Sequence, residues 1–200
     1  MTSTRARGSG LRELTRRTVR AQIAERAIAL FIAQGFEETT VEQIATEVGM
    51  SARSVFRYFD TKEDMVVGSM QESGARLADA LADRPAEEDA WQALRGALAV
   101  LLAAIEEDRE GALARARMFA STPSLRAARQ QKHAQWRELL VPVVLARLDG
   151  GPQETRELRA AAITTAVLGC LDLAITRWSE EGGTGSVEDL LDAAISAVRM

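Results

Sequence analysis

The segment 40–59 constrains the fold of this chain most, because it carries the start signals of two short helices on either side of a tight turn. Thr40 and Gln43 have the spacing of a capping box, in which each side chain bonds the backbone N–H of the other residue. Gly49 ends the first of these helices, and Ser51 is placed to cap the second. This layout is typical of a helix-turn-helix, and a generic helical hairpin is the alternative.

The rest of the chain also favours helices. Hydrophobic residues make up 46% of it and aromatic residues only 4%, while helix-forming Ala, Leu, Arg and Glu dominate. Apolar periodicity, caps and turn residues predict helices at about 11–34, 41–48, 52–59, 62–82, 90–106, 110–120, 125–148, 153–181 and 187–198. We therefore expect an all-α protein of about nine helices, with an N-terminal three-helix domain over residues 1–62 and a helical domain over residues 63–200.

Charge is unevenly distributed along the chain. The net charge is −4, which by itself does not suggest a nucleic-acid partner. However, residues 1–20 contain six arginines and one glutamate, so positive charge is concentrated in an N-terminal arm. The arm belongs to the same N-terminal part of the chain as the predicted helix-turn-helix, so its positive charge could assist DNA binding.

Other features exclude several classes of protein. The single cysteine, Cys170, forbids an intrachain disulfide and suits a reducing cytosol. The apolar stretch 160–175 is interrupted by polar residues and is shorter than the ~20 residues that cross a bilayer, so we expect a soluble, cytoplasmic protein without a membrane partner. One histidine, His133, and no metal-spaced cluster, phosphate loop or nucleophile elbow argue against an enzyme, a metal or a cofactor.

A run of motifs carries a resemblance to a known family. These motifs are IALFIAQGF at 28–36, TTVEQIATEVGMS at 39–51, ARSVFRYF at 52–59 and DTKEDM at 60–65. Together they resemble the TetR (tetracycline-repressor) family over about residues 15–66. Residues 51–64 and the C-terminal end of the sequence look most like an actinobacterial subgroup of this family. Its members include mycofactocin-type regulators and others described as acyl-CoA-binding-like.

The residues of the second short helix suggest which side chains read DNA bases. Val55 and Phe59 are four residues apart and should face the core, so Arg53, Phe56 and Arg57 are expected on the outer face. An aromatic ring can lie on a thymine methyl group or a sugar, while arginine can bind guanine O6 and N7. Solvated arginines are the alternative interpretation.

A second set of residues is expected to contact phosphates. Its members lie at helix starts, at the end of the helix-turn-helix or in the basic arm, where hydroxyls, cations and free backbone N–H groups attract anions. They are Thr40, Ser51, Ser54, Tyr58, Lys62, Arg16 and Arg17, and Arg5, Arg7 and Arg12 extend the arm. For Lys62 the resemblance also implies a phosphate contact. Simple caps and solvated side chains are the alternative.

The C-terminal half supplies candidates for a dimer interface, because one such DNA-binding domain offers too small a surface for specific affinity and two copies would read a palindrome. The interface candidates are Ala162, Ala166, Gly169, Leu173, Thr176, Leu191 and Ile195 on the last two helices. Internal core packing is the alternative for all of them.

Candidates for an apolar ligand cavity are Trp91, Leu98, Met118, Phe119, Trp136, Leu140, Leu168 and Cys170. Plain core packing is again the alternative. The resemblance further implies that CoA phosphates could dock at Arg115, Arg117, Arg126, Arg129 and Lys132.

The resemblance therefore implies a sequence-specific DNA-binding transcriptional regulator. Such a protein would be a homodimeric repressor, released from a palindromic operator by a small apolar or acyl-type ligand such as an acyl-CoA. A helical ligand-binding or interaction protein without specific DNA binding is the alternative, although it would leave the outward Arg53, Phe56 and Arg57 unexplained.

Overall fold

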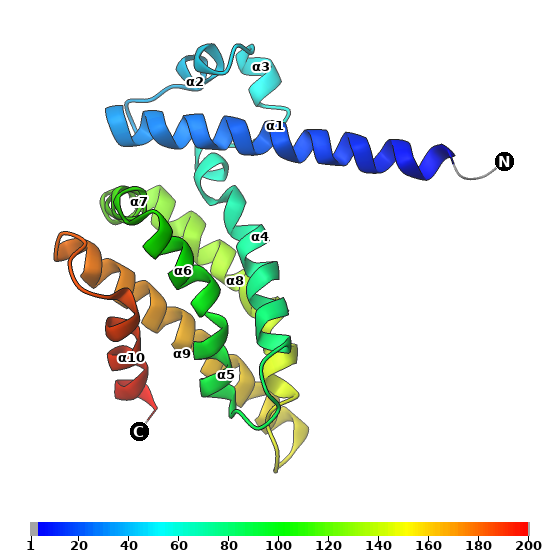
Figure 1. Ribbon diagram of the computed structural model, residues 1–200, viewed down its shortest axis with the longest axis vertical. Coiled ribbons are helices and arrows are strands. Elements are labelled where there is room, and N and C mark those ends of the chain that lie inside the picture. The colour runs from blue at the N-terminus through cyan, green and yellow to red at the C-terminus, as the bar shows by residue number, and fades with distance from the viewer. Residues whose placement is uncertain (1–3, 200) are drawn as a thin grey trace. The chain divides into compact units, whose positions relative to one another are not determined.

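The computed structural model describes residues 4–199, and of residues 4–11, 69 and 71 the backbone alone. The described residues form ten helices and no strand (Figure 1). Contacts divide the chain into two compact units, Met1–Ser69 and Met70–Met200, and the division falls inside helix α4 (Lys62–Ala82). The all-α class predicted from the sequence is confirmed, while the boundary proposed at residues 62 and 63 lies at the start of this helix.

The N-terminal unit contains α1 (Thr4–Gln34), α2 (Val41–Glu47) and α3 (Ala52–Val55). Gly35 ends α1 with φ 98°, a left-handed conformation that favours glycine, and its N–H donates to the Phe31 carbonyl at 2.9 Å. The predicted capping box of Thr40 and Gln43 is present at the start of α2. The core of this unit consists of Ile23, Ala27, Phe31, Phe36, Thr39, Ile44, Ala45, Val55, Phe59 and Met65, with Val66 and Val67 on α4.

Two helices differ in length from the predictions. The first begins at Thr4 instead of residue 11. The third ends at Val55 instead of residue 59, because the N–H groups of Arg57 and Tyr58 bond the carbonyls three residues earlier. Such bonds tighten the chain into turns of the 3₁₀ kind. Phe56 and Arg57 therefore lie on a turn that continues α3 and not within the helix itself.

The C-terminal unit contains the second part of α4 and six further helices. These are α5 (Ala90–Ala97), α6 (Ala99–Glu107), α7 (Arg109–Ser121), α8 (Pro123–Leu145), α9 (Gln153–Glu180) and α10 (Val187–Val198). Helix α9 contacts α5, α7, α8 and α10, and so forms the centre of the unit (Figure 1). The single helix predicted at 90–106 is two helices that meet at Leu98, just after the weak helix former Gly96.

Two arginines connect helices that are distant in sequence. Arg95 on α5 donates to Asp192 at 2.7 Å and to Glu188 at 2.6 Å, both on α10. Arg109 at the start of α7 donates to the carbonyls of Gly183 and Gly185 in the α9–α10 loop, at 2.8 and 2.7 Å. These bonds hold the first half of α10 and the loop before it against the rest of the unit.

Helix α9 corrects one argument made from the sequence. Its 28 residues are long and apolar enough to cross a membrane, so the stretch is not too short, as the sequence suggested. The helix instead buries one side, with Ala160, Val167, Leu171 and Trp178, against its neighbours in the unit. An apolar helix that is largely packed in a core passes the same test of length and composition.

Candidate nucleic-acid interface

Helix α3 and the turn after it expose the three side chains that the sequence proposes as base readers. Phe56 is 50% exposed, and Arg53 and Arg57 are also exposed. Val55 and Phe59, which lie between and beyond them, are buried in the core of the N-terminal unit. A half-exposed phenylalanine between two arginines is suited to contact a flat, negatively charged surface such as the floor of a DNA groove.

The local fold of this segment comes from its caps. The Ser51 hydroxyl accepts a bond from the Ser54 N–H at 3.2 Å, which starts α3. Gly49, with φ 67°, allows the sharp turn between α2 and α3. Buried Val55 and Phe59 then fix which face of the segment points outward. The exposure of Arg53 and Arg57 is therefore a consequence of the same pattern that predicted the helix-turn-helix.

Arg20 supports this segment from α1, a contact that no pattern in the sequence indicates. Its guanidinium donates to the Tyr58 carbonyl and lies 4.1 Å from the centroid of the Phe59 ring. An arginine over an aromatic face gains a cation–π interaction. The two residues are too far apart in sequence for spacing to reveal the contact. Arg20 thus holds in place the end of the recognition segment, by which we mean α3 and the turn after it, residues 52–59.

A basic groove lies on the same unit. Its volume is about 540 Å³, and it is lined by Arg12, Thr15, Arg16, Arg57 and Tyr58. The groove brings together Arg16 and Tyr58, proposed as phosphate contacts, and Arg57, proposed as a base reader. It adds Thr15, which the sequence did not single out. Three guanidinium groups around one groove are arranged to bind phosphate oxygens.

Among the described side chains, the remaining candidates for phosphate contacts do not line this groove. Arg17 is not among the residues that line the groove, and it forms an exposed ion pair with Glu13 at 3.6 Å. The Ser51 and Ser54 hydroxyls lie 3.0 Å apart and bond each other, and Thr40 is an exposed cap. The side chains of Arg5 and Arg7 lie outside the described residues.

Lys62 has a different environment from the one the sequence suggests. Its ammonium donates to the carbonyl oxygens of Phe36 at 2.8 Å and Thr39 at 3.1 Å, with a longer bond to Glu37 at 3.4 Å. Because an ammonium has only three donors, a phosphate would have to replace one of these bonds. The structure therefore shows Lys62 bound to the loop between α1 and α2, and its contact with phosphate stays a prediction.

In the C-terminal unit most of the predicted ligand-cavity residues lie in one continuous core. Leu98, Trp136, Leu140, Leu168 and Cys170 are all buried there. Burial raises the pKa of the Cys170 thiol. Met118 is also buried, and Phe119 is half-buried with the Arg129 guanidinium 5.1 Å from its ring centroid. The structure thus brings five of the eight together as core.

Trp91, the last of these candidates, lines a separate groove of about 590 Å³ between α5 and α10. Three arginines in this groove, Arg84, Arg95 and Arg199, have carboxylate partners. Hydrogen bonds from Arg95 hold the pKa of Asp192 below its ordinary value. The positive charge of the groove is therefore largely neutralised within the chain.

A buried polar cluster that the sequence did not predict joins α8 to α9. Asp172 on α9 lies 3.3 Å from Nδ1 of His133 and 3.5 Å from Nε of Arg129. Within the proposed CoA-phosphate set, Arg115 pairs with Asp108 and Arg126 donates to the Ala120 carbonyl. Three of those five cations, Arg129 included, therefore already have partners inside the unit.

Helix α9 leaves one apolar face exposed. Leu158 is 72% and Leu173 67% exposed, and Ala162 and Gly169 lie on the same side. A Cβ added at Gly169 would meet no atom of the described residues within 4 Å, so no contact within that part of the chain explains a glycine there. Of the other interface candidates, Ala166 and Thr176 are half-buried. Leu191 and Ile195 are buried in the core, as in the alternative of internal packing, and their part in an interface is not tested by this burial.

Comparison with known proteins matches both units. Residues 23–67 match the family model for bacterial regulatory proteins of the tetR family, and residues 88–200 match the MftR C-terminal domain. The mycofactocin biosynthesis transcriptional regulator MftR of Mycobacterium tuberculosis, a name marked as putative, is 30% identical over 92% of this chain and 90% of its own length. The regulator TcmR of Streptomyces glaucescens is 35% identical over 70% of this chain, which spans 65% of that protein.

Solved structures show the same fold at lower sequence identity. The transcriptional regulator FadR from Bacillus subtilis, in complex with stearoyl-CoA, has a TM-score of 0.60 and 17% identity over 88% of this chain and 95% of its own. FadR from Thermus thermophilus, in complex with lauroyl-CoA, has a TM-score of 0.57 and 18% identity over 88% of this chain and 91% of its own.

Proposed function

Since this chain belongs to the TetR family of bacterial regulatory proteins, we propose that it is a homodimeric repressor that leaves a palindromic operator when an acyl-type or other apolar ligand binds. Family membership makes the chain a DNA-binding transcriptional regulator and not an enzyme. The repressor mode, the palindrome, the dimer, the ligand and a cytoplasmic location are parts of the proposal. The alternative of an interaction protein without DNA binding does not fit the family.

The observation that carries the DNA-binding part is the outward face formed by Arg53, Phe56 and Arg57. Each member is exposed, while Val55 and Phe59 are buried in the core, so packing within the unit fixes which face points outward. Arg53 and Arg57 can each bind guanine through two hydrogen bonds, and Phe56 can contact a thymine methyl group. The basic groove beside Arg57 then supplies phosphate contacts that set the position on the duplex.

The exposed face of α9 supports the dimer. Apolar side chains such as Leu158 and Leu173 are rarely left uncovered together on a monomer. Gly169 allows a second helix to approach closely. In a symmetric dimer the α9 helices of the two copies would pack together and cover each other's apolar face. Two recognition segments about 34–36 Å apart would then reach successive major grooves of a palindrome.

The ligand part rests on the structural neighbours. The two FadR proteins of this fold are complexes with acyl-CoA, and the C-terminal unit of this chain has an apolar core bordered by arginines. We therefore propose an acyl-CoA or a similar amphiphile as the ligand. Its binding must favour one arrangement of the regulatory unit over another in order to release DNA.

The test uses DNA from around the chain's own gene in a fluorescence anisotropy titration over a range of salt concentrations. We expect sequence-selective binding, which Arg53→Ala weakens by about 1–3 kcal/mol while relaxing the sequence preference. The matched control, Arg17→Ala, should weaken specific and random DNA alike. Equal binding of specific and random DNA by the unmodified protein would exclude the operator proposal.

The ligand is tested in the same titration with lauroyl-CoA and stearoyl-CoA. CoA alone and the free fatty acids are the controls. If the acyl-CoAs release the operator and the controls do not, the acyl-type ligand is supported. Continued binding at saturating acyl-CoA would exclude that ligand class while leaving the DNA-binding proposal intact.

A further inference from the structure

We infer that Trp136 on α8 is the positioning residue for α4, the helix that connects the two units. Trp136 is only 4% exposed, and its indole N–H donates to the carbonyl oxygen of Met70 at 2.7 Å. Met70 is the first residue of the C-terminal unit, and α4 runs from Lys62 through this position without a break. A carbonyl has a second lone pair, so it can accept this bond in addition to its helical one.

Gly74 makes the close approach of the indole possible. It lies in the interior of α4, where glycine is unfavourable, and it is not among the described glycines with positive φ. A Cβ at this position would lie 2.4 Å from Cδ1 and 2.5 Å from Nε1 of Trp136. The contact with the indole is therefore what requires a glycine here.

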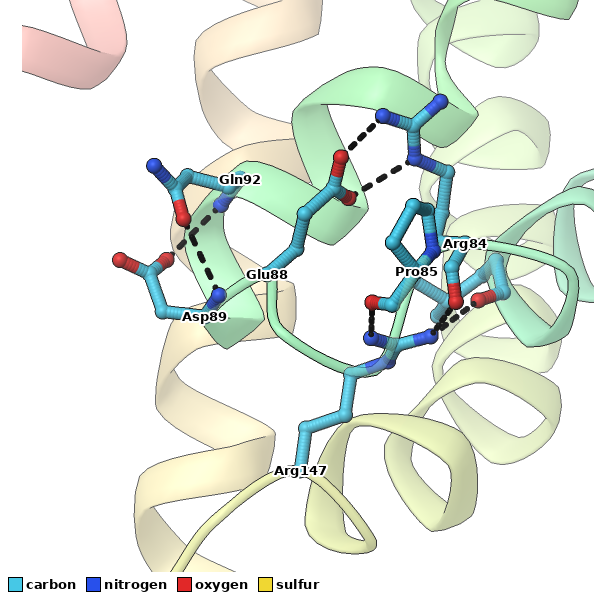
Figure 2. Close-up of polar contacts among 7 residues, drawn as sticks. Arg84, Pro85, Glu88, Asp89, Gln92 and Arg147 are labelled. Carbon is cyan, nitrogen blue, oxygen red and sulfur yellow. Dashed lines mark hydrogen bonds and ion pairs between the residues drawn. The ribbon is translucent and has the colours of Figure 1, made fainter.

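A second contact holds the other end of the same stretch. Arg147, just after α8, donates to the carbonyls of Leu81, Arg84 and Pro85 at 3.1, 2.7 and 2.7 Å, and so caps the end of α4 (Figure 2). Met70 and Leu81 are separated by the same number of residues as Trp136 and Arg147, about three helical turns. Helix α4 is thus bonded to α8 at both ends of this stretch, and the two helices should move together.

Trp136 is itself held by its neighbours. Its ring lies 5.0 Å from that of His133, measured between centroids, and Nδ1 of His133 lies 3.3 Å from Asp172 on α9. Contacts therefore run without a gap from α9, through α8, to the backbone of α4. A shift of α8 against α9 within the C-terminal unit would reach α4 through this tryptophan.

The experiment measures amide hydrogen exchange in the free protein by mass spectrometry, without DNA or ligand. Trp136→Phe keeps an aromatic ring but removes the N–H donor, and Trp91→Phe makes the same change at a half-buried tryptophan on α5. We expect exchange of peptides covering residues 70–77 to rise by about tenfold in Trp136→Phe only. No change, or an equal change in both variants, would overturn the inference.

Gly74→Ala tests the same contact with Trp136 still present. Alanine alone would strengthen the helix and slow its exchange. If the added methyl group displaces the indole, exchange in α4 will instead become faster, and this opposite sign cannot come from helix propensity. Slower exchange in Gly74→Ala would contradict the positioning role.

The consequence for DNA rests on the proposed function. We expect Trp136→Phe to weaken operator binding several-fold more than Trp91→Phe, because α4, which continues into the N-terminal unit, is then held less firmly. Failure of the unmodified protein to bind an operator would refute the proposed function and leave the exchange result to decide the role of Trp136. Normal operator binding by Trp136→Phe would refute its effect on DNA.

Discussion

The ammonium of Lys62 lies 2.8 Å from the carbonyl oxygen of Phe36 and 4.7 Å from the centroid of the same residue's ring. One cation therefore binds both the backbone and the side chain of a residue in the loop before α2. This loop leads into the helix-turn-helix. Lys62 consequently stabilises the entry to the DNA-binding segment from the start of α4.

Lys62→Met should lower the free energy of unfolding by about 1–3 kcal/mol, because it leaves backbone carbonyls without their charged donor. The salt dependence of operator binding should stay unchanged. Thermal unfolding and salt titrations measure both quantities. Lys132→Met is the matched control, since the sequence has no other lysine. A flatter salt dependence with unchanged stability would show instead that Lys62 contacts a DNA phosphate.

Phe56→Ala should change stability by no more than about 0.5 kcal/mol, because the ring is half-exposed, yet it should weaken operator binding. The same substitution at buried Phe59 should cost about 3–5 kcal/mol of stability. Urea denaturation and operator titration compare the two. If Phe56→Ala leaves operator affinity unaltered, the ring has no role at the DNA surface.

Leu173→Glu should convert the proposed dimer into monomers, because it places a charge on the exposed apolar face of α9. Sedimentation equilibrium measures the change in mass. Leu139→Glu is the control, since that leucine is 45% exposed on α8, outside the proposed interface. An unchanged mass for Leu173→Glu would show that this face of α9 is not the dimer interface.

Asp192→Asn should reduce stability by less than about 1 kcal/mol at neutral pH, because its pair with Arg95 is partly exposed. The folded protein holds the pKa of Asp192 below its ordinary value through that hydrogen bond. The contribution is therefore fully present above about pH 4 and is lost as pH falls through the lowered pKa. Unfolding measured from pH 7 to pH 3 should show the difference in stability from the unmodified protein shrink, and a difference that stays constant to pH 3 would contradict the role of this pair.

Much of the N-terminal unit could be predicted because its signals are local. The Thr40 capping box, the glycines at 35 and 49, and the alternation of Val55 and Phe59 with exposed residues all act within a few positions. The contacts of Lys62 and Arg20 join segments far apart in the chain, so spacing could not reveal them.

The C-terminal unit was less predictable for a different reason. Residues that line a cavity and residues that fill a core have the same apolar pattern along a helix, so Leu140 and Leu168 could not be assigned to either from sequence. For the same reason Leu191 and Ile195 resembled interface residues. Gly74 gave no signal, because its explanation is an indole from another helix.

The α9–α10 loop that Arg109 binds leaves little room for change at Gly183. This residue has φ 78°, a left-handed backbone, and a Cβ there would lie 2.8 Å from Leu113 on α7. The backbone conformation and the packing therefore favour glycine independently of each other. A smaller residue at position 113 would remove only the second constraint, so the loop should tolerate change at position 113 before it tolerates any at position 183.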